Sequence, residues 1–369
     1  MSEKVLMKGN EAIAESAIRA GCRFFFGYPI TPQTEVAAYM AKRMAKEGGT
    51  YLQAESEIAA INMVYGASAA GARAMTSSSS PGISLKAEGI SYLAGADLPA
   101  VIINVQRGGP GLGGIQPSQA DYWQATRAMG HGDFHVIVLA PSTVQEMAQE
   151  VYDAFDLADT YRTPVMILAD GMLGQMMEPV VLPEAKGELP AKPWAVTGTK
   201  CEREHNVVNS LYLKPEDLER TNRERFERYA AIKRDEQRAE EIMVEDADVV
   251  IVAFGACARI ARSAVNKARA EGIKAGLIRP ISLWPYPTDA IERAIPTAGA
   301  FLAVEMNMGQ MVDDVRLAVN GRVPVEFYGR TGGIIPTPAE VLAEIERLDA
   351  EVKARAAAPA VECVGGGAQ

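Results

Sequence analysis

Short apolar runs rich in β-branched residues recur through the first half of the chain, and candidate helices separate them. The runs cover residues 101–105, 136–139 and 165–168, and the helix expected between the last two spans 143–161. Such short apolar runs suit parallel strands that are buried on both faces. Their alternation with helices predicts an α/β fold built on a doubly wound parallel sheet.

The segments before these runs continue the alternation. A helix that ends at a glycine is expected over residues 11–20, and a buried strand over 23–27. Two more helices are expected over 32–47, with a proline in the first turn, and over 55–71. We therefore assign residues 1–180 to one domain.

A second α/β unit follows a linker. Residues 181–245 contain prolines that break regular structure and then a highly charged helical stretch, which fits a solvated linker helix or, alternatively, a docking site for a partner. A strand at 248–253 and a helix at 258–271 predict a smaller α/β domain over 246–345. The Ala- and Gly-rich end, residues 346–369, is expected to be a flexible tail.

Composition excludes several classes of protein. The chain has 369 residues, enough for two domains, and 48% of them are hydrophobic. Its net charge of −10 argues against nucleic-acid binding, because phosphate backbones repel an acidic chain. We expect no signal peptide and no membrane span, since no apolar run has the length that either needs.

The cysteines are scattered. Cys22, Cys201, Cys257 and Cys363 form no CxxC pair. This pattern argues against a disulfide framework, a zinc site or an iron–sulfur cluster held by this chain alone, and it fits a reducing cytoplasm.

Two patterns suggest cofactors but lack the context that those cofactors need. Residues 109–114 satisfy G-x-G-x-x-G, yet Pro117 interferes with the helix that a dinucleotide fingerprint requires. We expect an active-site loop there instead, because glycines permit close approach to a ligand. His131 and His135 are spaced like metal ligands on a helix, but a strand is expected to begin at His135, which argues against a metal site.

Two carboxylates open the Ala-rich helix. Glu55 and Glu57 would gain from the helix dipole, which is the ordinary explanation for acidic residues at this position. The rest of the helix is small or apolar on every side, which predicts burial. A glutamate that enters a buried helix must be paired, hydrogen-bonded or protonated, and such carboxylates often carry chemistry.

Polar residues follow at two further places. The segment TSSSSPG at 76–82 is expected to form a loop rich in hydroxyl and amide donors, for which a solvated loop is the ordinary alternative. Arg107 ends the strand at 101–105, where it is well placed to bind an anion, and a surface salt bridge is the alternative.

As a set, these motifs resemble the α subunit of the 2-oxoacid:ferredoxin oxidoreductases. The motifs are, in order, Gly9-Asn10-Glu11-Ala12, GYPITPQ at 27–33, Glu57, TSSSSPG at 76–82, Gln106-Arg107-Gly108, His131-Gly132-Asp133, FGACARIA at 254–261 and IRPISLWPYP at 278–287. The loop GGPGLGGIQPSQAD at 108–121 most resembles the 2-oxoisovalerate, or branched-chain, members.

The resemblance implies a fold and a site. Residues 1–180 would form a thiamine-diphosphate pyrimidine domain, and 246–345 a domain like the C-terminal domain of transketolase. The implied roles are a hydrogen bond from Glu57 to N1′ of the thiamine aminopyrimidine, cofactor contacts from Pro29 and Ile30, binding of the 2-oxoacid carboxylate by Thr31 and Arg107, and, less firmly, contacts from Ser79, Ser80 and Gly82. Coenzyme A would be the cosubstrate that takes the acyl group.

The resemblance also implies partners, because the GDG…N motif for Mg²⁺ and the cluster cysteines are absent from the sequence. A β subunit would carry the Mg²⁺-diphosphate half and a [4Fe–4S] cluster, alongside γ and ferredoxin-like δ subunits and an electron acceptor such as ferredoxin. Three alternatives stay open: another 2-oxoacid substrate (2-oxoglutarate, pyruvate or an aryl 2-oxoacid), a non-catalytic assembly subunit, and an independent nicotinamide enzyme, which the loop at 109–114 disfavours.

Overall fold

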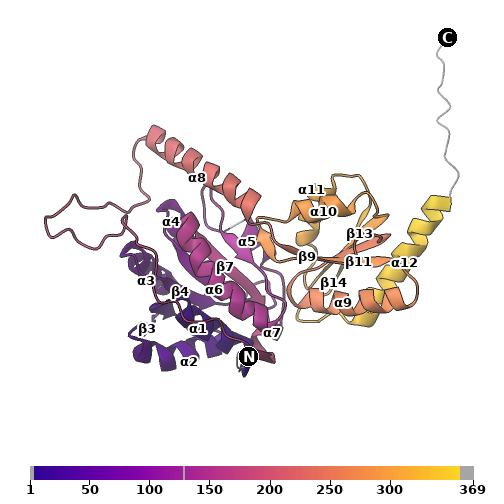
Figure 1. Ribbon diagram of the computed structural model, residues 1–369, viewed down its shortest axis with the longest axis horizontal. Coiled ribbons are helices and arrows are strands. Elements are labelled where there is room, and N and C mark those ends of the chain that lie inside the picture. The colour runs from indigo at the N-terminus through magenta and orange to yellow at the C-terminus, as the bar shows by residue number, and fades with distance from the viewer. Residues whose placement is uncertain (1–3, 128, 358–369) are drawn as a thin grey trace, which may run out of the picture.

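The computed structural model describes residues 4–127 and 129–357, and these residues form two lobes (Figure 1). The first lobe holds a seven-stranded sheet and the second a five-stranded sheet, both mostly parallel. The helix α8 (Pro215–Asp235) lies along the first lobe. The predicted α/β class, with a doubly wound sheet and a smaller second α/β domain, is confirmed.

The first sheet has the strand order β12-β6-β7-β5-β4-β2-β3, and every neighbouring pair except β12 with β6 is parallel. Its strands are β2 (Phe24–Gly27), β3 (Thr50–Gln53), β4 (Ala74–Ser78), β5 (Ala100–Gln106), β6 (Ile137–Leu139), β7 (Pro164–Asp170) and β12 (Ser282–Trp284). The central strands β4, β5 and β7 are buried along their whole length. Their carboxyl ends meet at one edge of the sheet, where such folds bind ligands.

Helices cover both faces of this sheet. The main ones are α1 (Gly9–Arg19), α2 (Thr34–Arg43) and α6 (Val144–Tyr161), which pack together, and α3 (Glu57–Ala69) and α4 (Ser80–Gly95), which pack on each other. Right-handed crossovers place these two groups on opposite faces. Shorter elements are η1 (Met44–Glu47), α5 (Tyr122–Thr126), α7 (Gly171–Gln175) and the antiparallel pair β1 (Val5–Lys8) and β8 (Met177–Val180).

The second sheet has the order β14-β13-β10-β11-β9, and only β9 is antiparallel to its neighbour. Its strands are β9 (Ala239–Ile242), β10 (Val249–Val252), β11 (Ala275–Pro280), β13 (Ala300–Glu305) and β14 (Val325–Gly329). The helices of this lobe are α9 (Gly255–Ala270), α10 (Thr288–Ala294), α11 (Met311–Val319) and α12 (Pro338–Ala357).

The expected domain limits need correction, because two strands join a sheet that those limits do not assign to them. β9, within the expected linker 181–245, is the edge strand of the second sheet, and β12, within the expected domain 246–345, extends the first sheet. The expected tail 346–369 begins too early, because α12 continues to Ala357 with Leu348 buried. Residues 358–369 lie outside the described residues.

The charged helix α8 is more than a solvated linker. Thr221, Arg225, Tyr229 and Ile232 are buried at helical spacing against the first lobe. Arg225 donates hydrogen bonds to Asp97 Oδ1 (3.2 Å) and to the Gly95 carbonyl (3.0 Å). The opposite face is charged and exposed, so the expectation of a partner-docking role stays a prediction.

Two helix predictions need correction. The helix expected over 32–47 begins later, because α2 starts at Thr34 and Pro32 lies in the preceding turn. The helix expected to be buried on every side, α3, exposes Ile58 and Asn62 and buries only the face that meets the sheet and α4. Apolar composition alone therefore overstated the burial of α3.

The segment 76–82 is also different from the loop that was expected. Thr76–Ser78 belong to β4, and α4 begins at Ser80 with Pro81 in its first turn. The backbone of Thr76–Ser78 pairs with β5, whereas β2 pairs only with Ala74 and Met75, and the hydroxyls are small enough to bury. Only Ser79 connects the strand to the helix.

Candidate active site

The buried carboxylate at the start of α3 is Glu57. Ser56 has extended backbone and caps the helix, because its Oγ accepts a hydrogen bond from the Ala59 N–H (3.1 Å). The cap fixes Glu57 as the first helical residue and turns its side chain inward, where it is 6% exposed. Glu55, two residues earlier, is exposed. Of the two carboxylates considered from the sequence, only Glu57 enters the interior.

The first turn of α4 forms the other wall beside this carboxylate. Glu57 Oε1 lies 2.8 Å from the position that a Cβ would take at Gly82, and such a Cβ would also overlap the Ser78 hydroxyl. Only glycine permits this close approach. Gly82, Ser78 and Glu57 therefore pack closely as one polar cluster at the carboxyl end of β4.

The hydroxyls of residues 76–80, at the end of β4 and the start of α4, fall into two groups. Ser77 Oγ donates to Gln33 Oε1 (2.5 Å), and Ser80 Oγ donates to Asp121 Oδ2 (2.6 Å). The second group has no partner among the described residues although it is buried; it consists of Thr76 Oγ1, Ser78 Oγ and Ser79 Oγ. Buried polar groups without partners carry a free-energy cost, and a ligand could satisfy them.

Two buried amide side chains hold the segment that precedes α2 through hydrogen bonds to its backbone carbonyls. Asn10, fully buried at the start of α1, donates to the Pro32 carbonyl (2.8 Å). Gln33 donates to the Tyr28 carbonyl (3.3 Å) while it accepts from Ser77. Pro29 and Thr31 stay exposed between these anchors, and Ile30 is half-buried. The loop is thus rigid at its base and open at its tip.

Arg107 connects this loop to the glycine loop. It is 7% exposed, and its guanidinium donates to the carbonyls of Thr31 (Nη1, 3.0 Å) and Leu112 (Nη2, 3.2 Å). Its Nε is buried and has no partner among the described residues. The structure therefore brings the two residues expected to bind a carboxylate next to each other, and it leaves one charged donor of Arg107 unused.

The glycine loop itself is an irregular segment, as expected. No helix opens at residues 109–114, and the next helix is the short α5. Gly108 lies against Gly332 and Gly333 of the second lobe, and a Cβ on Gly333 would collide with Gln116. Glycines from both lobes thus meet beside Arg107, which places the second lobe at the edge of the site.

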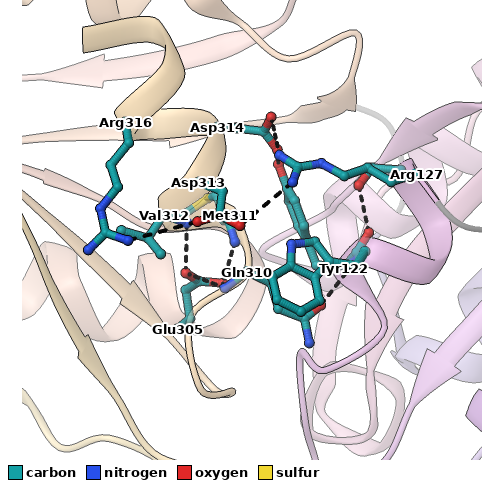
Figure 2. A network of polar contacts seen from close by, with 11 residues as sticks. Tyr122, Arg127, Glu305, Gln310, Met311, Val312, Asp313, Asp314 and Arg316 are labelled. Atoms are coloured by element: carbon teal, nitrogen blue, oxygen red, sulfur yellow. Dashed lines mark hydrogen bonds and ion pairs between the residues drawn. The ribbon is translucent and has the colours of Figure 1, made fainter. Parts of the chain in front are cut away.

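A polar network fixes the two lobes relative to each other (Figure 2). Tyr122 Oη donates to Asp314 Oδ2 (2.5 Å), and Arg127 donates to Asp314 Oδ1 (2.6 Å). Gln119 forms four hydrogen bonds across the same boundary, with the backbone of Phe254 and Met306 and with Asn307, at 2.8–3.0 Å. Because Gln119 closes the glycine loop, this network holds the loop in place.

Sequence reasoning missed several residues of this site. Lys86, Gln33, Asn10 and Asp121 are buried or nearly so and touch the residues named above. Lys86 had a detectable signal: it interrupts the apolar stripe of Ile83 and Ile90 on the buried face of α4. A lysine in such a stripe indicates a buried charge.

The histidines and cysteines do not gather around a ligand. His135 stacks on the Trp284 ring (centroids 4.5 Å apart), and burial lowers its pKa to about 4. Across residues 4–127 and 129–357, no three His, Cys, Asp or Glu side chains are grouped as metal ligands would be. In the same part of the chain, no helix combines the length and hydropathy needed to span a bilayer.

Two family models match the chain. Residues 15–244 match the thiamine-diphosphate-binding domain of pyruvate flavodoxin/ferredoxin oxidoreductases, and residues 247–341 match core domain II of pyruvate:ferredoxin oxidoreductase. The first match covers more than half of the chain.

Relatives match along almost their whole length. A ketoisovalerate oxidoreductase subunit of Methanothermobacter marburgensis is 50% identical over 347 residues, which cover 94% of this chain and 98% of the relative. A 2-oxoglutarate synthase subunit of Archaeoglobus fulgidus is 40% identical over 333 residues, which cover 89% of this chain and 95% of the relative.

Solved structures agree with the fold. The 2-oxoglutarate:ferredoxin oxidoreductase of Magnetococcus marinus, solved with 2-oxoglutarate, coenzyme A and succinyl-CoA bound, superposes with a TM-score of 0.82 at 29% identity, over 94% of this chain and 66% of that chain. An inactive β4 tetramer of a split-gene transketolase shares the fold at a TM-score of 0.57 and 14% identity, over 94% of this chain and 98% of that one. The expected likeness to transketolase is confirmed at the level of the fold. The chain therefore belongs to the pyruvate flavodoxin/ferredoxin oxidoreductase family and is a subunit of a thiamine-diphosphate-dependent 2-oxoacid:ferredoxin oxidoreductase.

Proposed function

We propose that this chain supplies the pyrimidine half of the thiamine-diphosphate site in a coenzyme A-acylating ketoisovalerate:ferredoxin oxidoreductase. The choice of ketoisovalerate as the substrate rests on the 50% identity, over 94% of the chain, to a ketoisovalerate oxidoreductase subunit. The observation that carries the site is the buried Glu57 close to the unpartnered hydroxyl of Ser78.

The residues present fit the aminopyrimidine end of the cofactor. Glu57 would hydrogen-bond N1′ of the ring from a position that is 6% exposed and so shielded from water. Gly82 lets the first turn of α4 approach Glu57 and the Ser78 hydroxyl closely, and that hydroxyl has no partner among the described residues and could hydrogen-bond the ring. When bound, thiamine diphosphate acts as the electron sink for decarboxylation of the 2-oxoacid. The exposed Pro29 and the half-buried Ile30 contact the cofactor, and Ser80 orders the loop through Asp121.

Thr31 and Arg107 bind the substrate carboxylate. Thr31 is exposed at the tip of its loop and can donate a hydrogen bond from its hydroxyl. The unpartnered Nε of Arg107 and its charge favour an anion beside it, since a buried guanidinium with an unused donor gains from a carboxylate. The guanidinium is held in position by its hydrogen bonds to the carbonyls of Thr31 and Leu112.

The rest of the cofactor site comes from partner polypeptides. A β subunit carries the Mg²⁺-diphosphate half and a [4Fe–4S] cluster, and γ and ferredoxin-like δ subunits complete the complex and pass electrons to ferredoxin. Two features support this assignment: no metal-ligating group of side chains occurs in the described part of this chain, and Cys22, Cys201 and Cys257 are free and separate. Coenzyme A as acyl acceptor is supported by its presence in the Magnetococcus marinus structure.

A branched-chain substrate fits the glycine loop. The loop at 108–116 carries no charged side chain that could pair with the distal carboxylate of 2-oxoglutarate, and it exposes Leu112 and Ile115. Turnover of the purified complex with 2-oxoisovalerate, 2-oxoglutarate, pyruvate and an aryl 2-oxoacid tests this choice. A higher kcat/KM for 2-oxoglutarate than for 2-oxoisovalerate would refute it.

Glu57→Gln in the reconstituted complex tests the site. Removing a positioned acid–base group costs about 100-fold or more, so 2-oxoacid-dependent reduction of the acceptor should fall by at least that factor. Glu55→Gln is the matched control, because Glu55 is exposed and should keep turnover near normal. Near-normal turnover of Glu57→Gln would remove Glu57 from the mechanism.

A titration calorimetry experiment tests the division of the cofactor site between polypeptides. Thiamine diphosphate with Mg²⁺ should bind tightly to the complex and weakly or not at all to the purified chain, because the described residues hold no metal-ligating group for the Mg²⁺-diphosphate end. Equal affinity for both would show that this chain holds the whole cofactor by itself.

A further inference from the structure

One buried charge near the site has no assigned role. Lys86, in the second turn of α4, is 0% exposed, and its Nζ donates to the Ser77 carbonyl (3.1 Å) at the end of β4. That hydrogen bond uses one of the three ammonium protons. Lysine is almost never fully buried unless it is paired, because burial disfavours its charged form. Burial lowers the pKa of Lys86 to about 7.

The side chain of Lys86 extends toward Glu57. Residues four apart on a helix lie on one face, and their side chains lean toward the N-terminus of the helix. Lys86 lies four residues after Gly82, whose open side faces Glu57 Oε1. Its hydrogen bond to the Ser77 carbonyl places Nζ at the end of β4, one residue before Ser78, whose hydroxyl lies beside Gly82. The charge of Glu57 in turn raises the pKa of Lys86, against the larger effect of burial.

The other charged groups around this pair are engaged elsewhere or exposed. Glu55 on α3 and Glu88 on α4 are exposed, and Glu88 accepts a hydrogen bond from Tyr92. Arg107, at the end of β5, is bonded to backbone carbonyls, and Asp121 is bonded to Ser80 and Asn104. The remaining neighbours on β4 are hydroxyls. Among the described residues, Glu57 is thus the one carboxylate whose charge acts on Lys86.

We propose that Lys86 is a positioning residue that acts through Glu57: its buried ammonium keeps the Glu57 carboxylate charged and oriented toward the pyrimidine site. This inference rests on the proposed role of Glu57. An ammonium nearby stabilises a carboxylate in its ionised form, and it does so strongly in an interior that excludes water.

The test uses two neutral variants in the reconstituted complex. Lys86→Met fills the same space without charge, and Lys86→Gln is neutral but can still donate to the Ser77 carbonyl. In both, the acid limb of the kcat/KM profile for 2-oxoisovalerate should move up by about one pH unit or more, as expected when an opposite charge nearby is lost. The pH dependence of thiamine diphosphate affinity, measured by titration calorimetry, should move in the same direction.

Lys192→Met is the matched control. Lys192 is also largely buried and pairs with Asp159 (2.6 Å), but it lies on the segment after β8, away from Glu57. This variant should lose stability without moving either pH profile. A loss of turnover in Lys86→Gln that is equal at every pH, or a shift in the control of the same size, would overturn the inference. If Lys86→Met does not assemble, Lys86→Gln decides alone.

The two proposals fail in different ways. If Glu57→Gln keeps its turnover, the assigned role of Glu57 is wrong, and with it the basis of the Lys86 inference. If Glu57→Gln is inactive while both Lys86 variants keep the wild-type acid limb, the site stands and Lys86 only supports the end of β4.

Discussion

At the scale of single residues, the site depends on small polar side chains in places where a globular core normally has apolar ones. Thr76, Ser77 and Ser78 occupy a central strand, and Gly82 replaces a side chain that would fill the space beside Glu57. A polar interior of this kind is costly when it is empty and gains free energy when a polar ligand enters it. Binding of the cofactor should therefore stabilise this region more than its contact area suggests.

Gly82→Ala should damage both stability and cofactor binding. The added Cβ would overlap the Ser78 hydroxyl and press on Glu57 Oε1, and overpacking of this kind costs about 1–3 kcal/mol. Thermal unfolding should detect the loss, and titration with thiamine diphosphate should show weaker binding to the complex. Gly66→Ala is the control, because a Cβ there has free space in the middle of α3 and should stabilise the helix by up to about 1 kcal/mol. Equal behaviour of the two variants would contradict the crowding argument.

The sequence predicts the place of a site residue when the signal lies within one segment, and it does not predict contacts between segments that are far apart in the chain. Burial of one face of the helix that Glu57 opens could be inferred from composition, which overstated its extent, and the choice of Glu57 over Glu55 came from the family resemblance. Arg107 at a strand end follows from general rules of parallel sheets. The partners of Arg107, the carbonyls of Thr31 and Leu112, could not be foreseen, since they depend on how two loops meet in space.

At the scale of elements, helix N-termini carry much of the organisation. Ser56 caps α3, Thr143 caps α6 through its Oγ1 and the Glu146 N–H (3.1 Å), and Asp170 caps α7. The α3 cap matters most for chemistry, because it sets the direction in which Glu57 leaves the backbone. The α6 cap has the same form but lies away from the site.

Ser56→Ala and Thr143→Ala should therefore differ in function but not in stability. Each removes one capping hydrogen bond and should cost about 1 kcal/mol in the free energy of unfolding. Only Ser56→Ala should also reduce kcat of the complex, because the first turn of α3 frays and Glu57 loses its fixed position. Ser56→Asp should restore the cap. Equal kcat values for the two alanine variants would show that the cap does not position Glu57.

The sequence predicts elements well where the signal lies within one segment. The apolar strands at 101–105, 136–139 and 165–168 were recognised, because burial on both faces leaves few polar residues in them. β4 was missed since its hydroxyls look like those of a loop, and β12 was missed because its pairing with β6 joins residues that are far apart in sequence. The second half of α12 fell within the expected tail because its last turn is rich in alanine, which suits a helix and a frayed tail alike.

At the scale of the whole molecule, two buried acids at the boundary between the lobes are stabilised by the N–H groups of helix N-termini, beside ion pairs such as Arg127–Asp314. Glu305 is fully buried and accepts the N–H groups of Met311 (2.8 Å) and Val312 (3.0 Å) at the start of α11 (Figure 2). Asp170, at the end of β7, accepts those of Met172 and Leu173. Helix dipoles and free N–H groups favour such anions.

Asp170 makes the stability of this boundary depend on pH. Burial raises its pKa from 3.8 to about 6, although the N–H groups of Leu173, Ala256 and Met172 oppose the shift. The folded state therefore binds the Asp170 proton more tightly than the unfolded state does. The stability that this proton provides is fully present below pH 4 and is lost as the pH rises through about 6.

Asp170→Asn should therefore change the free energy of unfolding by different amounts at pH 4 and at pH 7. The amide oxygen keeps the cap on α7 but carries no charge, so the variant escapes the loss that wild type suffers between pH 4 and pH 7. Relative to wild type, it should gain up to about 3 kcal/mol of unfolding free energy over that interval, with crowding of its NH₂ group against α9 as an offset that does not vary with pH. Denaturant unfolding of both proteins at several pH values measures this difference directly. A constant difference from pH 4 to pH 7.5 would show that Asp170 does not titrate at the boundary, and that the lobes are held by the contacts of Gln119 and Asp314 without a contribution from its charge.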